Sequence, residues 1–240
     1  MSVFAIIPAR YNSKRFPGKP LALINGQPMF KWVYDACQAC GLVGKTILAT
    51  DDARIYDASK SCGCDVVLTG NARSGTDRVY ECAINRGLSA DDIVINVQGD
   101  EPLIMPEHLS SIVKHMADNP RCSISSIATT VDYQQAISPN VVKVVIDHCN
   151  RALYFSRLPV AYNSKRYLKH IGVYAFRMAS LSLFCNLKPG PLEIAENLEQ
   201  LRALEHGIPI DVILTRYDTI GVDIPEDIDR VCKHLASVTN

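Results

Sequence analysis

The chain has 240 residues, of which 48% are hydrophobic and 21% are charged, as in an ordinary globular protein with one sizeable core. Its 25 Lys and Arg residues balance its 25 Asp and Glu residues, which argues against a general nucleic-acid-binding protein. No apolar run approaches the roughly 18 residues of a membrane-spanning helix, and the first residues lack a signal-peptide pattern. We expect a cytoplasmic protein that forms a single domain over residues 1–240, without membrane insertion.

The first half of the chain alternates short strands with helices. Strands are predicted at residues 3–9, 45–49, 65–68 and 92–97, and helices at 28–40, 53–62 and 76–86. The apolar runs are short and nearly continuous, as in a parallel sheet that is covered on both faces. The pattern therefore predicts an α/β fold with a doubly wound, mostly parallel, Rossmann-like sheet.

The first strand opens into a basic loop at residues 10–20. The planar guanidinium group of Arg, which can donate two parallel hydrogen bonds, and the compact ammonium group of Lys both neutralise phosphate oxygens. Gly18 lets the backbone approach a ligand closely. The loop therefore predicts a polyphosphate site, with a solvated basic turn as the alternative. Neither the Walker pattern nor the dinucleotide-binding glycine pattern is present. The cations of the loop are Arg10, Lys14, Arg15 and Lys19.

Two acidic turns are candidates for a metal site. Asp100 follows the predicted strand 92–97 in a turn that contains Gly99, and Asp223 lies in a distant turn before Pro225. Ligands of doubly wound sheets bind beyond the carboxyl ends of the strands, where Asp100 is expected. A pair of converging carboxylates suits Mg²⁺, which prefers few carboxylates plus phosphate oxygens and water. Taken singly, each Asp could also be a turn residue or a helix cap.

The second half of the chain has a different character. Two β-rich runs at 143–147 and 152–156 predict a hairpin, and another strand is predicted at 170–176. We expect a small antiparallel subdomain over about 143–177. A helix at 191–206, with apolar positions spaced to face the core, precedes a strand at 210–215 and a terminal helix that begins at 225.

The nine cysteines are more consistent with packed thiols than with disulfides, because their number is odd and no export signal is visible. Cys37, Cys40, Cys62 and Cys64 have spacings that also occur in zinc sites. Cys37 and Cys40 continue the apolar stripe of the helix predicted at 28–40, so we expect them to pack in the core.

Several short motifs occur in a fixed order from residue 3 to about residue 230. After an Ile-Pro-Ala strand they are RYNSKRFPGKP at 10–20, ATDD at 49–52, SGTDR at 74–78, NVQGDEP at 96–102, ALYFSR at 152–157, KHIGVY at 169–174, LEQLR at 198–202 and GVDIPED at 221–227. This ordered set resembles the CMP-Kdo synthetases, the 3-deoxy-manno-octulosonate (Kdo) cytidylyltransferases of the nucleotide-sugar transferase superfamily.

The resemblance implies transfer of CMP from CTP to the anomeric hydroxyl of Kdo, with release of pyrophosphate. It implies Mg²⁺ held by Asp100 and Asp223, catalytic cations Arg10 and Lys19, and a homodimer formed through the antiparallel subdomain. The implied nucleotide-binding residues are Pro8, Ala9, Arg10, Ser13, Arg15, Lys19, Arg73, Ser74, Gly75 and Gln98. The implied sugar-binding residues are Gln98, Arg157, His170, Tyr174, Glu199 and Gln200.

Some of these positions have other interpretations. Many members of the resembled family carry His where this chain has Arg73, which weakens a direct role for Arg73. Arg157 can pair with the sugar carboxylate as a fork or can instead support the fold. His170 can be a hydrogen-bonded structural histidine, and Glu199 a solvated charge.

The identity of the sugar is left open by the sequence. The short 158–169 segment resembles the capsule-associated branch rather than many lipopolysaccharide-pathway members. Activation of 8-amino-Kdo or a sialic-acid-like nonulosonate is the alternative enzyme activity, and a nucleotide-binding protein without catalysis is the alternative from another class.

Overall fold

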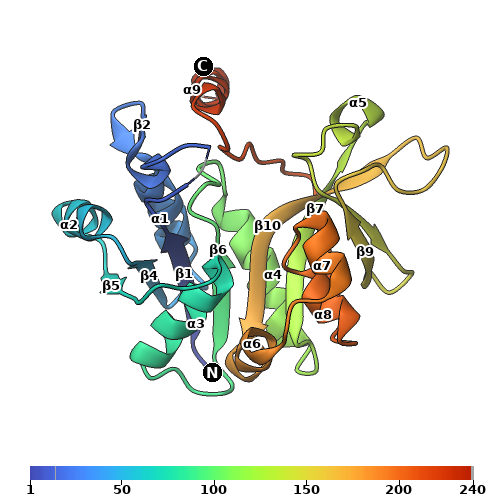
Figure 1. Cartoon of the computed structure of the whole chain (residues 1–240), viewed down its shortest axis with the longest axis horizontal. Coiled ribbons are helices and arrows are strands. Elements are labelled where there is room, and N and C mark those ends of the chain that lie inside the picture. Colours follow the sequence, from blue (N-terminus) through green and yellow to red (C-terminus); the bar gives the residue numbers. More distant parts are fainter. Residues whose placement is uncertain (14, 239–240) are drawn as a thin grey trace.

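The computed structural model describes residues 1–13 and 15–238, which form a layered α/β structure around one large sheet (Figure 1). Nine strands of the described chain belong to this sheet. Seven of them lie side by side in the order β11-β7-β10-β6-β1-β4-β5. Their bounds are Ile210–Thr215, Ile124–Val131, Tyr167–Arg177, Ile93–Val97, Val3–Ala9, Lys45–Thr50 and Val66–Leu68.

The pairing directions confirm the predicted mostly parallel sheet. Strand β1 pairs in parallel with β4 and β6, β4 with β5, and β7 with β11. Strand β10 is antiparallel to both of its main-sheet neighbours, β6 and β7. The six other strands therefore run in one direction, and their carboxyl ends meet at one edge, where ligands of such sheets bind.

Helices cover both faces of the sheet, as the near-continuous apolar strands predicted. Alternate residues of β1 point to opposite faces, so Ala5 and Ile7 enter one core cluster and Ile6 enters the other. Helices α1 (Met29–Ala39), α2 (Ala53–Ser61) and α4 (Pro106–Asp118) contribute to the first cluster. Helices α3 (Gly75–Asn85), α6 (Met178–Asn186) and α8 (Leu201–Glu205) contribute to the second cluster.

Local side-chain bonds explain where two of the helices begin. Asp52 accepts a hydrogen bond from the backbone N–H of Arg54 at the start of α2, and Ser74 accepts one from Asp77 N–H at the start of α3. Such caps satisfy backbone donors that the first helical turn leaves unpaired. The Ser74 cap also fixes the turn that enters the functional site described below.

The helix predicted at 191–206 is wrong as a single element. The structure has α7 (Pro191–Glu196) and then α8, separated by Asn197 in the left-handed conformation at φ 51°. A left-handed residue ends a helix, because the backbone direction changes there. The apolar spacing was misleading, since α7 buries no residue and Leu192 is 42% exposed.

The stretch expected as an antiparallel subdomain, 143–177, is divided between two environments. Strands β8 (Lys143–Ile146) and β9 (Ala152–Ser156) form an antiparallel hairpin. The hairpin joins the first part of β10 through the pairs Leu168–Val144 and Lys169–Lys143. The later part of β10 lies in the middle of the main sheet, where it pairs with β6. The strand begins at Tyr167, three residues before the strand predicted at 170–176. The short helix α5 (Tyr133–Ala136) lies beside this region.

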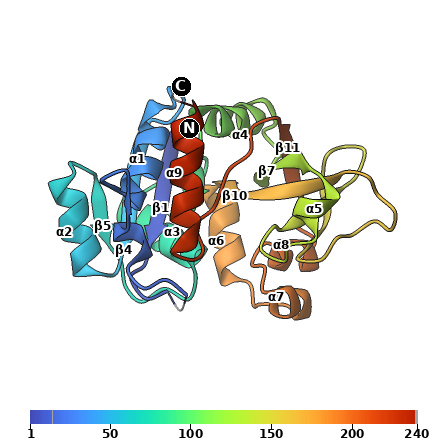
Figure 2. The same ribbon diagram turned by 90° about the horizontal axis from the view of Figure 1, so that it is seen from above.

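The end of the chain returns over the carboxyl edge of the sheet. After β11 it crosses to helix α9 (Glu226–Val238), as Figure 2 shows from above. Val222 and Val231 pack there against Ile24 and Met29, next to the small hairpin of β2 (Leu23–Ile24) and β3 (Gln27–Pro28). This return brings the 218–223 segment close to the turn after β6.

The nine cysteines, all in the described part of the chain, are free thiols. Cys37, within α1, and Cys40, which ends it, are buried in the core as predicted. No helix of the described residues is long and apolar enough to cross a membrane.

Candidate active site

A first cleft lies at the carboxyl edge of the sheet, between the loop after β1, the turn before α3 and the turn after β6. Gly99 keeps this region narrow, since a Cβ there would lie 3.0 Å from the carbonyl oxygen of Pro8. Eight of the ten predicted nucleotide-binding residues line the cleft: Pro8, Ala9, Arg10, Ser13, Lys19, Ser74, Gly75 and Gln98. The fold therefore brings predicted residues from three separate segments together in one cleft.

Lys19 connects the basic loop to both acidic turns. The loop turns at Gly18, whose φ of 73° is readily adopted only by glycine, and a short 3₁₀ helix, Lys19–Leu21, follows. Lys19 Nζ donates to Asp100 Oδ2 at 2.5 Å and to the carbonyl oxygen of Val222 at 2.8 Å. Only 13% of the Lys19 side chain is exposed, so this cation is held in one place.

The two predicted metal ligands lie in neighbouring turns. The backbone N–H of Val222 donates to the Asp100 carbonyl oxygen at 2.9 Å, which ties the two turns together. Asp223 Oδ1 pairs with Arg15 Nη2 at 2.8 Å. The Asp100 and Asp223 side chains are 38% and 35% exposed, so both carboxylates remain accessible beside the basic loop. Two accessible carboxylates next to a phosphate-type site fit the ligand preference of Mg²⁺.

A second, larger cleft adjoins the first at Asp100, which lines both. Its walls come from the 134–142 segment, the middle of β10 and the 218–223 segment. His170 lies in this cleft, with Nε2 2.8 Å from Ser126 Oγ and its ring edge-on to Phe155. Burial lowers the pKa of His170 to about 3, so the imidazole is neutral near pH 7. A molecule in the second cleft would lie directly beside the acidic turns.

Glu199 is connected to the first cleft by hydrogen bonds. Its carboxylate accepts from Ser74 Oγ and Thr76 Oγ1, each at 2.6 Å. Thr76 Oγ1 accepts from Asn96 Nδ2 at 3.1 Å, and Asn96 Oδ1 accepts from Gln98 Nε2 at 3.1 Å. Burial raises the pKa of Glu199, although the two hydroxyl donors act in the opposite direction. The network fixes which face Gln98 presents to the cleft.

Tyr174 and Gln200 lie with Glu199 around a small, mostly apolar pocket rather than in the second cleft. Burial raises the pKa of Tyr174 well above its ordinary value, so its hydroxyl stays protonated. Of the predicted sugar-binding residues, Gln98 therefore lines the first cleft and His170 the second, whereas Tyr174, Glu199 and Gln200 line the small pocket.

Arg157 makes its contacts with backbone carbonyl groups. Its guanidinium donates to the carbonyl oxygens of Glu196, Pro139 and Asn197 at 2.8, 3.0 and 3.2 Å. Arg157 is not among the residues that line the two clefts, although Pro139 adjoins the 140–142 wall of the second cleft. These contacts favour support of the fold, which was the alternative interpretation of this residue.

Arg73, just before α3, contacts the first turn of that helix and is not among the residues that line the first cleft. It pairs with Asp77 Oδ2 at 2.8 Å and donates to the Cys185 carbonyl oxygen, and its side chain is 67% exposed. Lys14, also predicted among the loop cations, lies outside the described residues.

Sequence reasoning did not select Arg78, which is 4% exposed and lines the first cleft. It donates to Thr69 Oγ1 at 2.6 Å and to Asp51 Oδ2 at 2.7 Å. A signal was present, because Arg78 ends the SGTDR motif and Asp51 lies in the ATDD motif. Arg78, in the first turn of α3, therefore ties the segments that follow β4 and β5 to this helix.

Sequence reasoning also did not select Glu101, which lines the second cleft next to Asp100. Its Oε2 atom is buried and has no hydrogen-bond partner among the described residues. Burial raises the pKa of Glu101 to about 7. Lys169, on the same cleft, donates to Asp218 Oδ1 at 2.8 Å and to the Thr219 carbonyl oxygen at 2.7 Å.

Known proteins resemble this chain over nearly its whole length. A family model described as cytidylyltransferase matches residues 4–213. The 3-deoxy-manno-octulosonate cytidylyltransferase of Nitratidesulfovibrio vulgaris (strain DP4) is 48% identical, over 97% of this chain and 95% of that protein. The protein of the same name from Syntrophobacter fumaroxidans (strain DSM 10017 / MPOB) is 45% identical, over 98% of each chain. A solved structure of CMP:2-keto-3-deoxy-manno-octonic acid synthetase complexed with CTP has a TM-score of 0.92 and 37% identity, over 99% of each chain.

Proposed function

Since the chain belongs to the 3-deoxy-manno-octulosonate cytidylyltransferases of the cytidylyltransferase family, we propose that it transfers CMP from CTP to the anomeric hydroxyl of Kdo. The products are CMP-Kdo and pyrophosphate. The observation that carries the proposal is the junction at Asp100, where the first cleft, with its basic loop, meets the second cleft. A nucleotide in one cleft and a sugar in the other would bring their reacting atoms together at that carboxylate.

The basic loop suits the triphosphate. Arg10 and Lys19 line the first cleft and can offset charge on the α-phosphate and on the leaving pyrophosphate. Arg15, which pairs with Asp223, can take part once phosphate oxygens compete for its guanidinium. Fixed cations of this kind lower the barrier because they are already oriented before charge develops.

The other residues that line the first cleft suit a pyrimidine base. Backbone groups of Pro8 and Ala9, the Ser74–Gly75 turn and Gln98 surround a narrow space. The network from Glu199 through Thr76 and Asn96 orients the Gln98 amide. A site whose polar groups match the cytosine edge penalises a base that lacks the exocyclic amine.

We assign Asp100 and Asp223 as the residues that would hold Mg²⁺. Bound there, Mg²⁺ would supply Lewis-acid activation of the α-phosphate and of the sugar hydroxyl. Their accessibility, and their shared place on the lining of the second cleft where Asp100 also meets the first, support this assignment. Lys19 keeps the Asp100 carboxylate in place, and Arg15 does the same for Asp223.

The second cleft is the proposed place for Kdo. His170 is the sugar-binding candidate that lines it, and Glu199, Gln200 and Tyr174 approach from the neighbouring pocket. We retain Arg157 as a candidate for the sugar carboxylate, which a variant can test because its present partners are neutral carbonyl groups.

We further propose that the protein acts in the cytoplasm as a homodimer formed through the 143–177 subdomain. Leu153 and Leu158, in and next to the β8–β9 hairpin, are 60% and 67% exposed, and Tyr162 is fully exposed. Covering such apolar side chains stabilises an interface.

The test of the proposed function is an acceptor panel. Purified protein with CTP and Mg²⁺ should release pyrophosphate with Kdo and give CMP-Kdo as the product. The panel should include 8-amino-Kdo and a sialic acid at matched concentrations. A higher kcat/KM for one of those two sugars would assign the alternative activity. If none of the sugars in the panel supported pyrophosphate release, activation of an acidic sugar would be rejected.

A further inference from the structure

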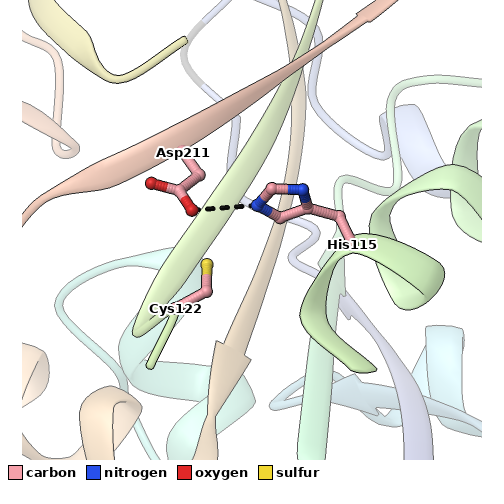
Figure 3. Close-up of side chains that lie close together, drawn as sticks. All are labelled: His115, Cys122 and Asp211. Atoms are coloured by element: carbon pink, nitrogen blue, oxygen red, sulfur yellow. Dashed lines mark hydrogen bonds and ion pairs between the residues drawn. The ribbon is translucent and has the colours of Figure 1, made fainter. Parts of the chain in front are cut away.

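Three side chains of metal-binding type converge at a place that the proposed reaction does not use. His115 comes from the last turn of α4, Cys122 precedes β7, and Asp211 lies near the start of β11 (Figure 3). One imidazole nitrogen, the sulfur and one carboxylate oxygen all lie within 4.8 Å of one another. Within residues 1–13 and 15–238 this is the one group of three or more such ligands that converges.

The cluster lies at the edge of the sheet opposite to the two clefts. Strands β7 and β11 are parallel, with Asp211 paired to Ser125, so Cys122 and Asp211 both lie where these strands begin. Helix α4 starts at Pro106, shortly after the turn that carries Asp100, and runs back to place His115 at its far end. The cluster is therefore separate from the assigned Mg²⁺ ligands.

The present bonds of the cluster leave it accessible but compact. His115 Nε2 and Asp211 Oδ2 share a hydrogen bond of 2.9 Å, and Cys122 Sγ donates to the Ile124 carbonyl oxygen at 3.4 Å. The His115 and Asp211 side chains are 30% and 23% exposed, whereas Cys122 is 7% exposed. Water and small ions can reach the imidazole and the carboxylate, and the sulfur closes the inner side of the cluster.

A nucleophilic cysteine is a poor interpretation of this arrangement. The imidazole nitrogen that faces the cluster is bonded to Asp211 rather than to the sulfur. Burial raises the pKa of the Cys122 thiol to about 12, whereas a reactive cysteine needs an environment that favours the thiolate.

We propose that His115, Cys122 and Asp211 bind one zinc ion. On binding zinc the Cys122 thiol would release its proton to water, and the resulting thiolate, a neutral imidazole and a carboxylate would together offset the two charges of Zn²⁺. This mixture of sulfur, nitrogen and oxygen is characteristic of zinc rather than of Mg²⁺ or Ca²⁺. Tetrahedral zinc with bonds of about 2.0–2.3 Å places its ligand atoms about 3.4–3.6 Å apart. The present atoms lie near this spacing, with His115 Nε2 2.9 Å from Asp211 Oδ2 and all three atoms within 4.8 Å of one another. A water molecule would complete the fourth position.

Zinc at this position would stabilise the outer part of the sheet. It would connect the end of α4 to the turn before β7 and to β11, the outermost strand on that side. An ion that binds only the folded chain raises the melting temperature. Free zinc at 100 times its Kd should raise the Tm of a chain of this length by about 5–10 °C.

The experiment uses the full chain freed of metal with a chelator and then titrated with zinc. One ion per chain should bind by calorimetry, and Tm should rise. Replacement by Co²⁺ should give a thiolate-to-cobalt charge-transfer band and the visible bands of tetrahedral cobalt. The band should be lost in Cys122→Ser and kept in Cys149→Ser, which changes an exposed cysteine.

Asp211→Asn provides a second variant, since an amide can still hydrogen-bond to His115 and preserve the fold. It should weaken zinc binding at least about tenfold, because even the loss of a residue that only hydrogen-bonds to a metal ligand has an effect of that size. It should leave CMP transfer unchanged in zinc-free buffer. A cobalt spectrum without the charge-transfer band, or one that survives Cys122→Ser, would overturn the proposal. Equal zinc affinity of the wild type and Asp211→Asn would overturn it as well.

Discussion

Lys19 and Asp100 form a charged hydrogen bond of 2.5 Å between residues 81 positions apart, joining the basic loop to the turn after β6. The Lys19 side chain is 13% exposed and that of Asp100 38%, so the pair is partly removed from water. This contact places a fixed cation at the boundary of the two clefts. In the proposed reaction it both orients Asp100 and faces the phosphates of CTP.

Lys19→Met should lower kcat/KM for CTP by about 100-fold or more, because an oriented charge at the reacting phosphate is lost. Lys45→Met is the matched control, since Lys45 is 49% exposed and pairs with Asp65 far from the clefts. Steady-state kinetics on both variants, with melting curves, measures the effect. Equal kcat/KM for Lys19→Met and the control would remove Lys19 from the catalytic residues.

Asp100→Asn and Asp223→Asn should each reduce kcat by about 1,000-fold or more while the fold remains intact. The amide keeps the size of the side chain but loses the charge that holds Mg²⁺. The control is Asp57→Asn, on the exposed face of α2. Initial rates over a range of Mg²⁺ concentrations give the result. If either variant turned over at a near-normal rate at limiting Mg²⁺, the metal assignment would be wrong.

Arg157→Lys and Arg157→Ala test the proposed sugar contact. Lysine keeps the positive charge but cannot donate the two parallel hydrogen bonds of a guanidinium group. The KM for Kdo should therefore rise at least about tenfold in both variants, and more in the Ala variant. The KM for CTP should stay within about twofold. Arg216→Ala, which removes an exposed guanidinium beside Tyr217, is the control.

The carbonyl contacts of Arg157 predict a different result if its role is to support the fold. In that case the melting temperature falls and the kinetic constants for both substrates change together. An unchanged KM for Kdo in a stable Arg157→Ala protein would eliminate the carboxylate contact.

His170 should make the folded chain sensitive to acid. An unfolded histidine takes up a proton near pH 6.5, whereas buried His170 does so only near pH 3. Between these values the unfolded state binds more protons, so the free energy of unfolding falls as pH falls, by about 1.4 kcal/mol per pH unit from this residue. The contribution of His170 is intact above pH 6.5.

Denaturant unfolding between pH 7 and pH 4.5 measures this slope. In His170→Gln the free energy of unfolding should fall less steeply with falling pH, by the linkage of one proton, and His148→Gln, on an exposed turn, is the matched control. Parallel slopes for the wild type and His170→Gln would show that His170 is not buried in its neutral form.

The parallel strands in the first half of the chain were predicted well, because each is a short apolar run that is recognisable without knowledge of its neighbours in the sheet. Strand β1 was predicted with its observed bounds, since Val3–Ala9 is apolar on both faces. Strand β7 was not predicted, although it lies in the sheet, because it buries hydroxyl residues. Ser126, for example, donates to the carbonyl oxygen of Val173 in β10, a partner that local sequence does not show.

The candidate site was predictable where a motif carries its own chemistry. The basic loop and the turn at Ser74 line the first cleft as expected. The residues that these side chains contact were not predictable, because the contacts join segments that are far apart in the sequence. Arg15 meets Asp223 across 208 positions, and Glu199 meets Ser74 across 125 positions. Periodicity also could not reveal that Asn197 interrupts the predicted helix at 191–206.

The most direct test of the account is the nucleotide dependence of pyrophosphate release with Kdo. Wild-type protein with Kdo and Mg²⁺ should release pyrophosphate from CTP in equal amount to the CMP-Kdo formed. UTP should be the next best substrate, and ATP and GTP should be lower in kcat/KM by at least about 100-fold. Asp100→Asn should show almost none of this activity. Comparable kcat/KM for ATP or GTP, or pyrophosphate release that does not depend on Kdo, would contradict the account.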